Sequence, residues 1–183
     1  MVGIILLVIL VIVVFYVIGL YNSLIRFKNQ VGNGWSQIDV QLKRRHDLIP
    51  NLIETCKGYM KHEKETLENI TNARSNAMGA DSISDKSSAE GALSGSISKF
   101  MLVVENYPDL KANANFISLQ EELSSTENKI AFSRQNYNDQ VLFFNNKIEM
   151  FPSNIIAGSF NFKQADFFEI EDKTERDVPK VKF

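Results

Sequence analysis

Few residues of this 183-residue chain have the type and spacing that chemistry requires. The densest group is the basic run Lys43–Asp47, whose letters are Lys-Arg-Arg-His-Asp. On a helix, consecutive residues point in different directions, so these charges do not converge on one phosphate. Arg45 lies near an apolar stripe, where a buried charge needs a partner. We therefore predict a structural polar layer in which Arg45 pairs with a carboxylate such as Glu122 or Glu127, in preference to a ligand site.

The histidines and the cysteine form no recognisable catalytic or metal-binding motif. Neither His46 nor His62 has a glutamate three residues before it, as di-metal helical bundles require. No second histidine follows His62 at the spacing of a zinc protease motif. The single cysteine, Cys56, lies on an apolar stripe, where burial is usual. We assign no catalytic, cofactor-binding or metal residue and expect no enzyme, and a net charge of −2 gives no reason to expect nucleic-acid binding.

The first 25 residues carry no charged side chain, and residues 2–21 are almost wholly apolar. About 20 such residues in a helix cover the roughly 30 Å hydrocarbon core of a bilayer. A cleaved signal peptide is the competing interpretation. It requires a basic start, a shorter apolar run and small residues before the cut, and this segment has none of these. We predict a transmembrane anchor that stays attached and lies in the lipid bilayer.

Basic residues follow this segment directly, beginning with Arg26 and Lys28. An excess of Lys and Arg marks the cytoplasmic end of a membrane span. We therefore expect a single-pass protein of the cell membrane with its N-terminus outside and the remaining chain in the cytoplasm.

The segment after the anchor has apolar residues every three or four positions, which is the spacing of a helix. The first stripe comprises Leu24, Phe27, Val31, Trp35, Ile38 and Leu42, and Trp35 is most simply a core residue. Pro50 is expected to end or kink this helix, because proline disfavours helical geometry in the residue before it. A second stripe comprises Leu52, Ile53, Cys56, Met60, Leu67 and Ile70 and fades near Met78.

Two further helices are predicted beyond this point. Residues 79–88 are rich in Gly, Ser and Asp and indicate a loop, and a third helix is expected over about 89–107, closed by Pro108. The fourth helix has the longest stripe, formed by Phe116, Leu119, Leu123, Ile130, Tyr137, Val141, Phe144 and Ile148. Its register also includes Thr126, Ser133 and Gln140, so its seam is partly polar.

These patterns predict an all-α protein, with an N-terminal transmembrane helix followed by an antiparallel, coiled-coil-like bundle of four long helices. We divide it into a transmembrane anchor (1–25), the four-helix bundle (26–150) and an apolar segment with a charged tail (151–183). Within 151–183, Pro152 breaks the fourth helix and an apolar cluster follows. This cluster is too short to span a bilayer, and packing on the bundle is favoured over lying on the membrane or meeting another subunit. The aromatic tail from Gln164 is expected to dock as well.

Two stretches carry a resemblance to a known family. Residues 34–52 read Gly-Trp-Ser-Gln-Ile-Asp-Val-Gln-Leu-Lys-Arg-Arg-His-Asp-Leu-Ile-Pro-Asn-Leu, and residues 105–113 read Glu-Asn-Tyr-Pro-Asp-Leu-Lys-Ala-Asn. Together with Phe-Pro-Ser-Asn at 151–154 and Val-Pro-Lys-Val-Lys-Phe at 178–183, they resemble the LemA family over nearly the whole chain. The resemblance implies a bacterial membrane protein with one N-terminal span and a helical bundle. It implies no agreed activity and transfers no site residue.

The function that we predict is a non-enzymatic, membrane-anchored scaffold that self-assembles into a homo-oligomer and organises or shapes the bacterial membrane. The alternative is an adaptor that binds another membrane protein. The resemblance contributes to both, because one branch of the family includes a magnetosome protein linked to internal-membrane formation. Some other members are encoded near a membrane-bound zinc metalloprotease.

Overall fold

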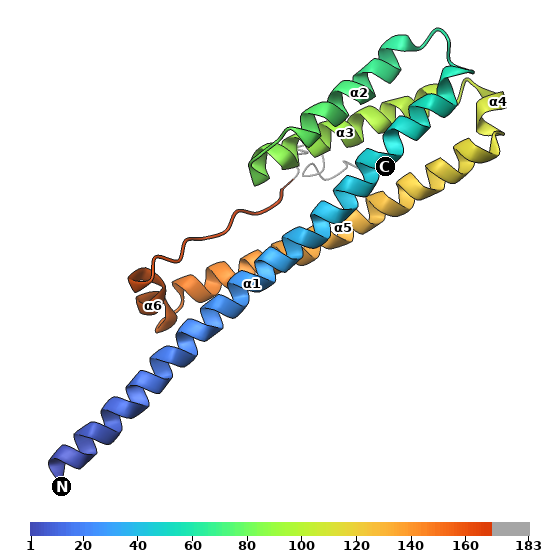
Figure 1. The fold of residues 1–183 in the computed structure, drawn as a ribbon. Helices are drawn as coiled ribbons and strands as arrows, with labels where there is room; N and C mark the ends of the chain where they lie inside the picture. Colours follow the sequence, from blue (N-terminus) through green and yellow to red (C-terminus); the bar gives the residue numbers. More distant parts are fainter. Residues whose placement is uncertain (170–183) are drawn as a thin grey trace, which may run out of the picture. The chain divides into compact units, whose positions relative to one another are not determined.

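The computed structural model describes residues 1–169, and every regular element in that part of the chain is a helix (Figure 1). The all-α prediction is therefore confirmed. In chain order the helices are α1 (Val2–Lys57), α2 (Lys64–Met78), α3 (Ile83–Val104), α4 (Pro108–Lys111), α5 (Ala114–Glu149) and α6 (Ser153–Ser159).

The chain forms two compact units. The first comprises residues 1–39 and 132–167, and the second comprises residues 40–131 together with Phe168 and Glu169. Helices α1 and α5 therefore each contribute residues to both units.

The start of α1 is the one stretch of the described chain that is long and apolar enough to cross a membrane. Its side chains from Val2 to Tyr16 are exposed, and none of its most apolar part is buried against the protein. A helix that is hydrophobic on all sides requires an apolar environment. The apolar start of α1 is long enough to cross the hydrocarbon core of a bilayer, as the sequence predicted.

Helix α1 continues past Pro50, so of the two expectations for this proline, the end of the helix is wrong and a kink stays a prediction. Proline lacks an amide hydrogen and leaves the carbonyl four residues earlier, that of His46, without a helical donor. Arg74 of α2 replaces that donor, since its Nε donates to the His46 carbonyl oxygen at 2.7 Å. Seven more helical residues follow the proline before α1 ends at Lys57.

The second apolar stripe is not one helix, contrary to the prediction. Residues 58–63 form a turn between α1 and α2, in which the amide of Met60 donates to the carbonyl of Cys56 at 2.9 Å. The Met60 side chain is nevertheless buried. Because the turn directs Met60 into the core, the three-four spacing continues although the helix does not.

The predicted loop over residues 79–88 is also too long. Helix α3 begins at Ile83, because Ser82 caps it: its Oγ accepts from the amide of Asp85 at 3.0 Å. A serine before an acidic residue at this spacing satisfies free amides at a helix start. The short connection that remains lets α2 and α3 pack side by side (Figure 1).

Helix α5 covers the predicted fourth helix almost residue for residue. Its stripe is buried at Phe116, Leu123, Ile130, Tyr137, Val141 and Phe144. The polar positions Thr126 and Ser133 in that register are buried too, which confirms the partly polar seam.

The core of the second unit joins side chains from five helices. Its buried residues are Ile49, Leu52, Cys56, Met60, Ile70, Ala77, Leu93, Phe100, Val104, Leu110, Phe116 and Leu123. In the first unit, Trp35 packs edge-on against Tyr137, with ring centroids 5.6 Å apart. A Cβ on Gly34 would lie 3.3 Å from the Tyr137 Cα, so this glycine lets α1 and α5 approach closely.

The segment after α6 packs on its own unit as an extended chain. Tyr137 donates its hydroxyl to the carbonyl of Asp166 at 2.7 Å. Asn145 pairs with both backbone groups of Ala165, donating at 3.0 Å and accepting at 2.9 Å. The tail therefore docks as expected at Ala165 and Asp166, whereas Val178, Val181 and Phe183 lie outside the described residues.

Candidate functional site

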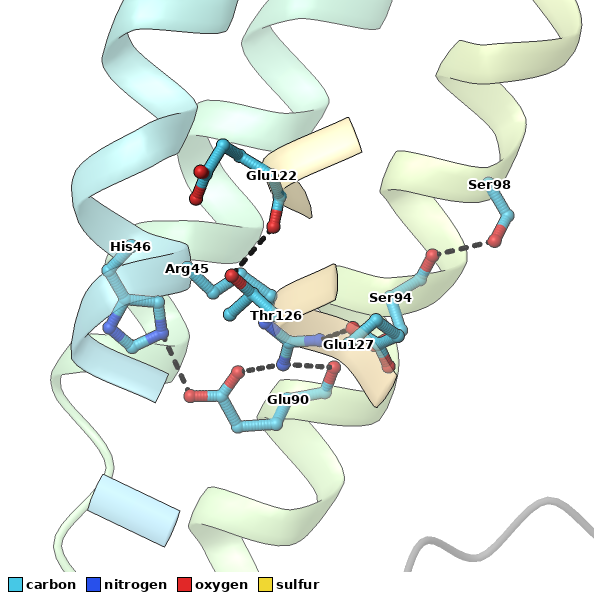
Figure 2. A network of polar contacts seen from close by, with 8 residues as sticks. All are labelled: Arg45, His46, Glu90, Ser94, Ser98, Glu122, Thr126 and Glu127. Atoms are coloured by element: carbon cyan, nitrogen blue, oxygen red, sulfur yellow. Dashed lines mark hydrogen bonds and ion pairs between the residues drawn. The ribbon is translucent and has the colours of Figure 1, made fainter. Parts of the chain in front are cut away.

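The polar layer predicted around Arg45 exists in the second unit and is the main concentration of buried charge there (Figure 2). Arg45 is only 1% exposed. Its Nη1 donates to Glu127, as predicted, and to the Ser94 hydroxyl at 2.7 Å. Glu127 comes from α5 and Ser94 from α3, so one guanidinium connects α1 with two other helices.

The residue that the sequence reasoning missed is Glu90 of α3, which is as deeply buried as Arg45. One of its carboxylate oxygens accepts from Arg45 Nη2, and the other lies 2.8 Å from His46 Nε2. Glu90 is three residues before the buried Leu93 and therefore continues the apolar stripe of α3. A charged residue at a core position was the signal that would have identified it.

The charge state of Glu90 follows from its neighbours. Burial opposes ionisation of the carboxyl, but the close contact with the His46 imidazole and the positive charge of Arg45 outweigh it. The pKa of Glu90 is therefore held below its ordinary value. An ionised Glu90 can accept from both partners at once, which the bidentate geometry of a carboxylate favours.

His46 of the basic run is buried with Arg45, whereas Lys43, Arg44 and Asp47 face outward. Arg44 pairs with Glu122, and Lys43 pairs with Asp47 within α1 at 2.9 Å. All four side chains are about half exposed or more. Of the two carboxylates proposed for Arg45, Glu127 is its partner and Glu122 binds the neighbouring arginine instead.

Thr126 lies fully buried beside this network on α5. Its hydroxyl donates to the Glu122 carbonyl within the same helix at 2.7 Å (Figure 2). This satisfies the hydroxyl locally, so Thr126 needs no partner from another helix.

The arrangement of Arg45 and its partners holds helices together through hydrogen bonds and ion pairs. The two Nη groups of Arg45 are occupied by carboxylates and a hydroxyl, and Glu90 is held by two cationic or donor groups. Removing one member of such a buried set leaves an uncompensated charge, which is strongly destabilising.

The other residues considered for chemistry, Cys56 and His62, do not belong to this network. Cys56 is buried in the apolar core, and burial raises the pKa of its thiol to about 12. A thiol in this state has almost no thiolate at neutral pH. His62 is exposed, and within residues 1–169 no three His, Cys, Asp or Glu side chains gather as a metal site would require.

Comparisons with known proteins agree with the resemblance noted in the sequence. The sequence model of the LemA family matches residues 34–183. Protein LemA of Metamycoplasma hominis is 31% identical over 168 residues, which are 90% of this chain and 75% of that protein.

More distant relatives include two magnetosome proteins. Magnetosome protein MamQ 2 of Paramagnetospirillum magneticum is 22% identical over 187 residues, covering 88% of this chain and 68% of its own. Magnetosome protein MamQ of Magnetospirillum gryphiswaldense is 20% identical with the same coverage. Since both the family model and a relative above 30% identity span most of the sequence, this chain belongs to the LemA family.

Proposed function

We propose that this protein is a membrane-anchored helical scaffold that assembles into homo-oligomers. The apolar start of α1 is its single-pass anchor, with the N-terminus outside and the other helices in the cytoplasm, since Arg26 and Lys28 follow the apolar run. In this proposal α1, α2, α3 and α5 pack as an antiparallel bundle. The short connection between α2 and α3 is typical of antiparallel neighbours.

Two exposed phenylalanines of α5 carry the proposal of self-assembly. Phe132 is 73% exposed and Phe143 is 53% exposed. Eleven residues make about three helical turns, so both rings lie on one face of α5. Burying a phenylalanine is worth roughly 1.5–3 kcal/mol, and contact with a second copy of this chain would recover that energy.

A second copy is the occupant that fits best, because an anchor concentrates copies of the chain in the membrane plane. Linked or co-localised contacts reinforce one another, so individually weak interfaces suffice for assembly. The relatives are consistent with action at a membrane, since two of them are named as magnetosome proteins. We extend to this chain only the expectation of a membrane-organising role.

The test is the size of the full-length protein in mild detergent over a range of concentrations. We expect species larger than one chain that grow with concentration. Phe132→Gln with Phe143→Gln should shift the protein towards the monomer. The control is Leu102→Gln with Met78→Gln, which removes equally exposed apolar side chains from α3 and α2 and should leave assembly unchanged. If the control pair dissociates the oligomer and the α5 pair does not, the interface is wrongly assigned.

Crosslinking in cells separates the scaffold from the adaptor. The scaffold predicts mainly adducts of this chain with itself, and these should weaken in the α5 variant. A dominant adduct with a different membrane protein, unaffected by that variant, would support the adaptor instead.

A further inference from the structure

An aromatic cluster fixes the C-terminal end of α6 against α1, directly after the apolar run. The ring of Tyr21 lies 4.8 Å from that of Phe160 and 6.0 Å from that of Phe162, centroid to centroid. Phe162 in turn contacts Phe144 of α5 at 6.4 Å. These residues all belong to the first unit, so the cluster is a feature of that unit alone.

The chain around α6 is apolar, uncharged and exposed. Residues 150–162 contain no Asp, Glu, Lys or Arg. Its largest apolar side chains are largely open to the surroundings, with Phe151 78% exposed and Met150, Ile155 and Phe160 each more than half exposed. An exposed apolar patch of this kind marks a surface that meets a partner or a membrane.

A groove beside this patch carries positive charge. It has a volume of about 580 Å³, and Lys28 and Lys163 are among its lining residues together with Tyr21 and Phe160. In the described chain neither lysine forms an ion pair with a carboxylate. A groove lined by two ammonium groups and by aromatic rings is complementary to an anion that has an apolar part.

The position of the groove along α1 indicates that this anion is a lipid headgroup. Residues 2–20 span about 28 Å of helix, close to the hydrocarbon thickness of a bilayer. Tyr21 then lies at the interface, where amphipathic rings are favoured. Lys28 is about 10 Å further along the helix, and a long lysine side chain can turn back towards the headgroups. The groove and the patch therefore coincide with the headgroup layer.

We propose that this groove binds an anionic phospholipid, with its phosphate between Lys28 and Lys163, while Phe151 and Ile155 insert into the membrane interface. The inference rests on the proposed anchoring of α1. It gives the chain a second membrane contact and replaces the packing role that the sequence favoured for this segment. Continuity with the apolar helix favours lipid over a second copy of the chain as the occupant.

Site-specific labelling tests the insertion, using the full-length protein in nanodiscs of phosphatidylcholine and phosphatidylglycerol. Separate Ile155→Cys, Ile9→Cys and Ser36→Cys variants carry a fluorophore, and nitroxide-labelled lipid is the quencher. The native Cys56 should stay unlabelled because it is buried and protonated. We expect labels at positions 9 and 155 to lose most of their fluorescence and the label at exposed position 36 to keep it.

These positions distinguish two failures. Quenching at 9 without quenching at 155 overturns the insertion of α6 and leaves the anchor intact. Absence of quenching at 9 contradicts the anchor itself and, with it, the present inference.

The second experiment tests the headgroup site through the thermal midpoint of the detergent-solubilised chain. Phosphatidylglycerol should raise the midpoint, whereas phosphatidylcholine and inorganic phosphate should not. Each lysine near an anionic headgroup is worth about a fivefold change in affinity, so Lys28→Gln with Lys163→Gln should weaken the apparent affinity about 25-fold. The charge-matched control, Lys61→Gln with Lys129→Gln, should leave it unchanged. Equal weakening by both pairs, or equal stabilisation by inorganic phosphate, would overturn the site.

Discussion

Arg74 Nε donates a hydrogen bond of 2.7 Å to the carbonyl oxygen of His46, the carbonyl that Pro50 deprives of its helical donor. The bond comes from α2 and therefore joins two helices at the point where α1 is locally weakest. It explains why a proline is compatible with a continuous α1.

This relationship predicts a coupling between positions 74 and 50. Arg74→Met leaves a partly buried carbonyl without a donor, so the free energy of unfolding should fall by about 1–3 kcal/mol. Pro50→Ala restores an amide that can donate to His46, and in that background the cost of Arg74→Met should fall below about 1 kcal/mol. Denaturant unfolding of the four full-length variants in detergent measures the coupling. The same cost in both backgrounds would show that Arg74 acts elsewhere.

The two carboxylates bound to Arg45 should differ in importance. Glu90→Gln removes a fully buried charge partner and should lower the free energy of unfolding by about 3–5 kcal/mol. Glu127→Gln is the matched change at a carboxylate that is 48% exposed, where less than about 1 kcal/mol is expected. Equal losses in the two variants would contradict the assignment of Glu90 as the central acceptor.

Acid should destabilise the protein through Glu90. Its pKa is lower in the folded chain than the ordinary value of 4.5, so the unfolded state binds more protons in the interval between the two values. The stabilisation is complete above the ordinary value and is lost as the pH falls through the lower, folded value. Thermal midpoints measured from about pH 6 to about pH 3 should therefore fall more steeply for the wild type than for Glu90→Gln. Parallel curves would mean that Glu90 is not held ionised.

Cys56 should behave as an inert core residue. Its raised pKa, about 12, and its complete burial predict very slow reaction with a thiol reagent at neutral pH. Denaturant should make the reaction fast, and a cysteine introduced at exposed Ser36 should react fast without it. Rapid modification of native Cys56 would show that the core around it opens readily.

Structure is most predictable from this sequence where the local residue pattern agrees with the tertiary packing. Helix α5 was recognisable because apolar residues recur in one register from Phe116 to Ile148, although polar residues fill some of its positions, and no proline interrupts it. The Arg45–Glu127 pair was also predictable, because a charge near an apolar stripe requires an opposite charge.

The errors have one physical origin, which is contact between residues distant in sequence. Pro50 does not end α1 because Arg74, 24 residues later, supplies a donor. The apolar spacing through Met60 continues across a turn, since burial depends on where a side chain points and not on helix continuity. Glu90 lay inside the predicted third helix but escaped notice, because its burial depends on pairing with Arg45, 45 residues earlier in the chain.

The most direct test of the account is the fate of the apolar start of α1 in the native membrane. Membranes from expressing cells are washed at alkaline pH, and the chain is identified in the pellet and in the supernatant by intact mass. We expect it in the pellet with residues 2–20 still attached. A chain that lacks about the first 20 residues and is recovered in the soluble fraction would contradict the anchor and the assembly that depends on it.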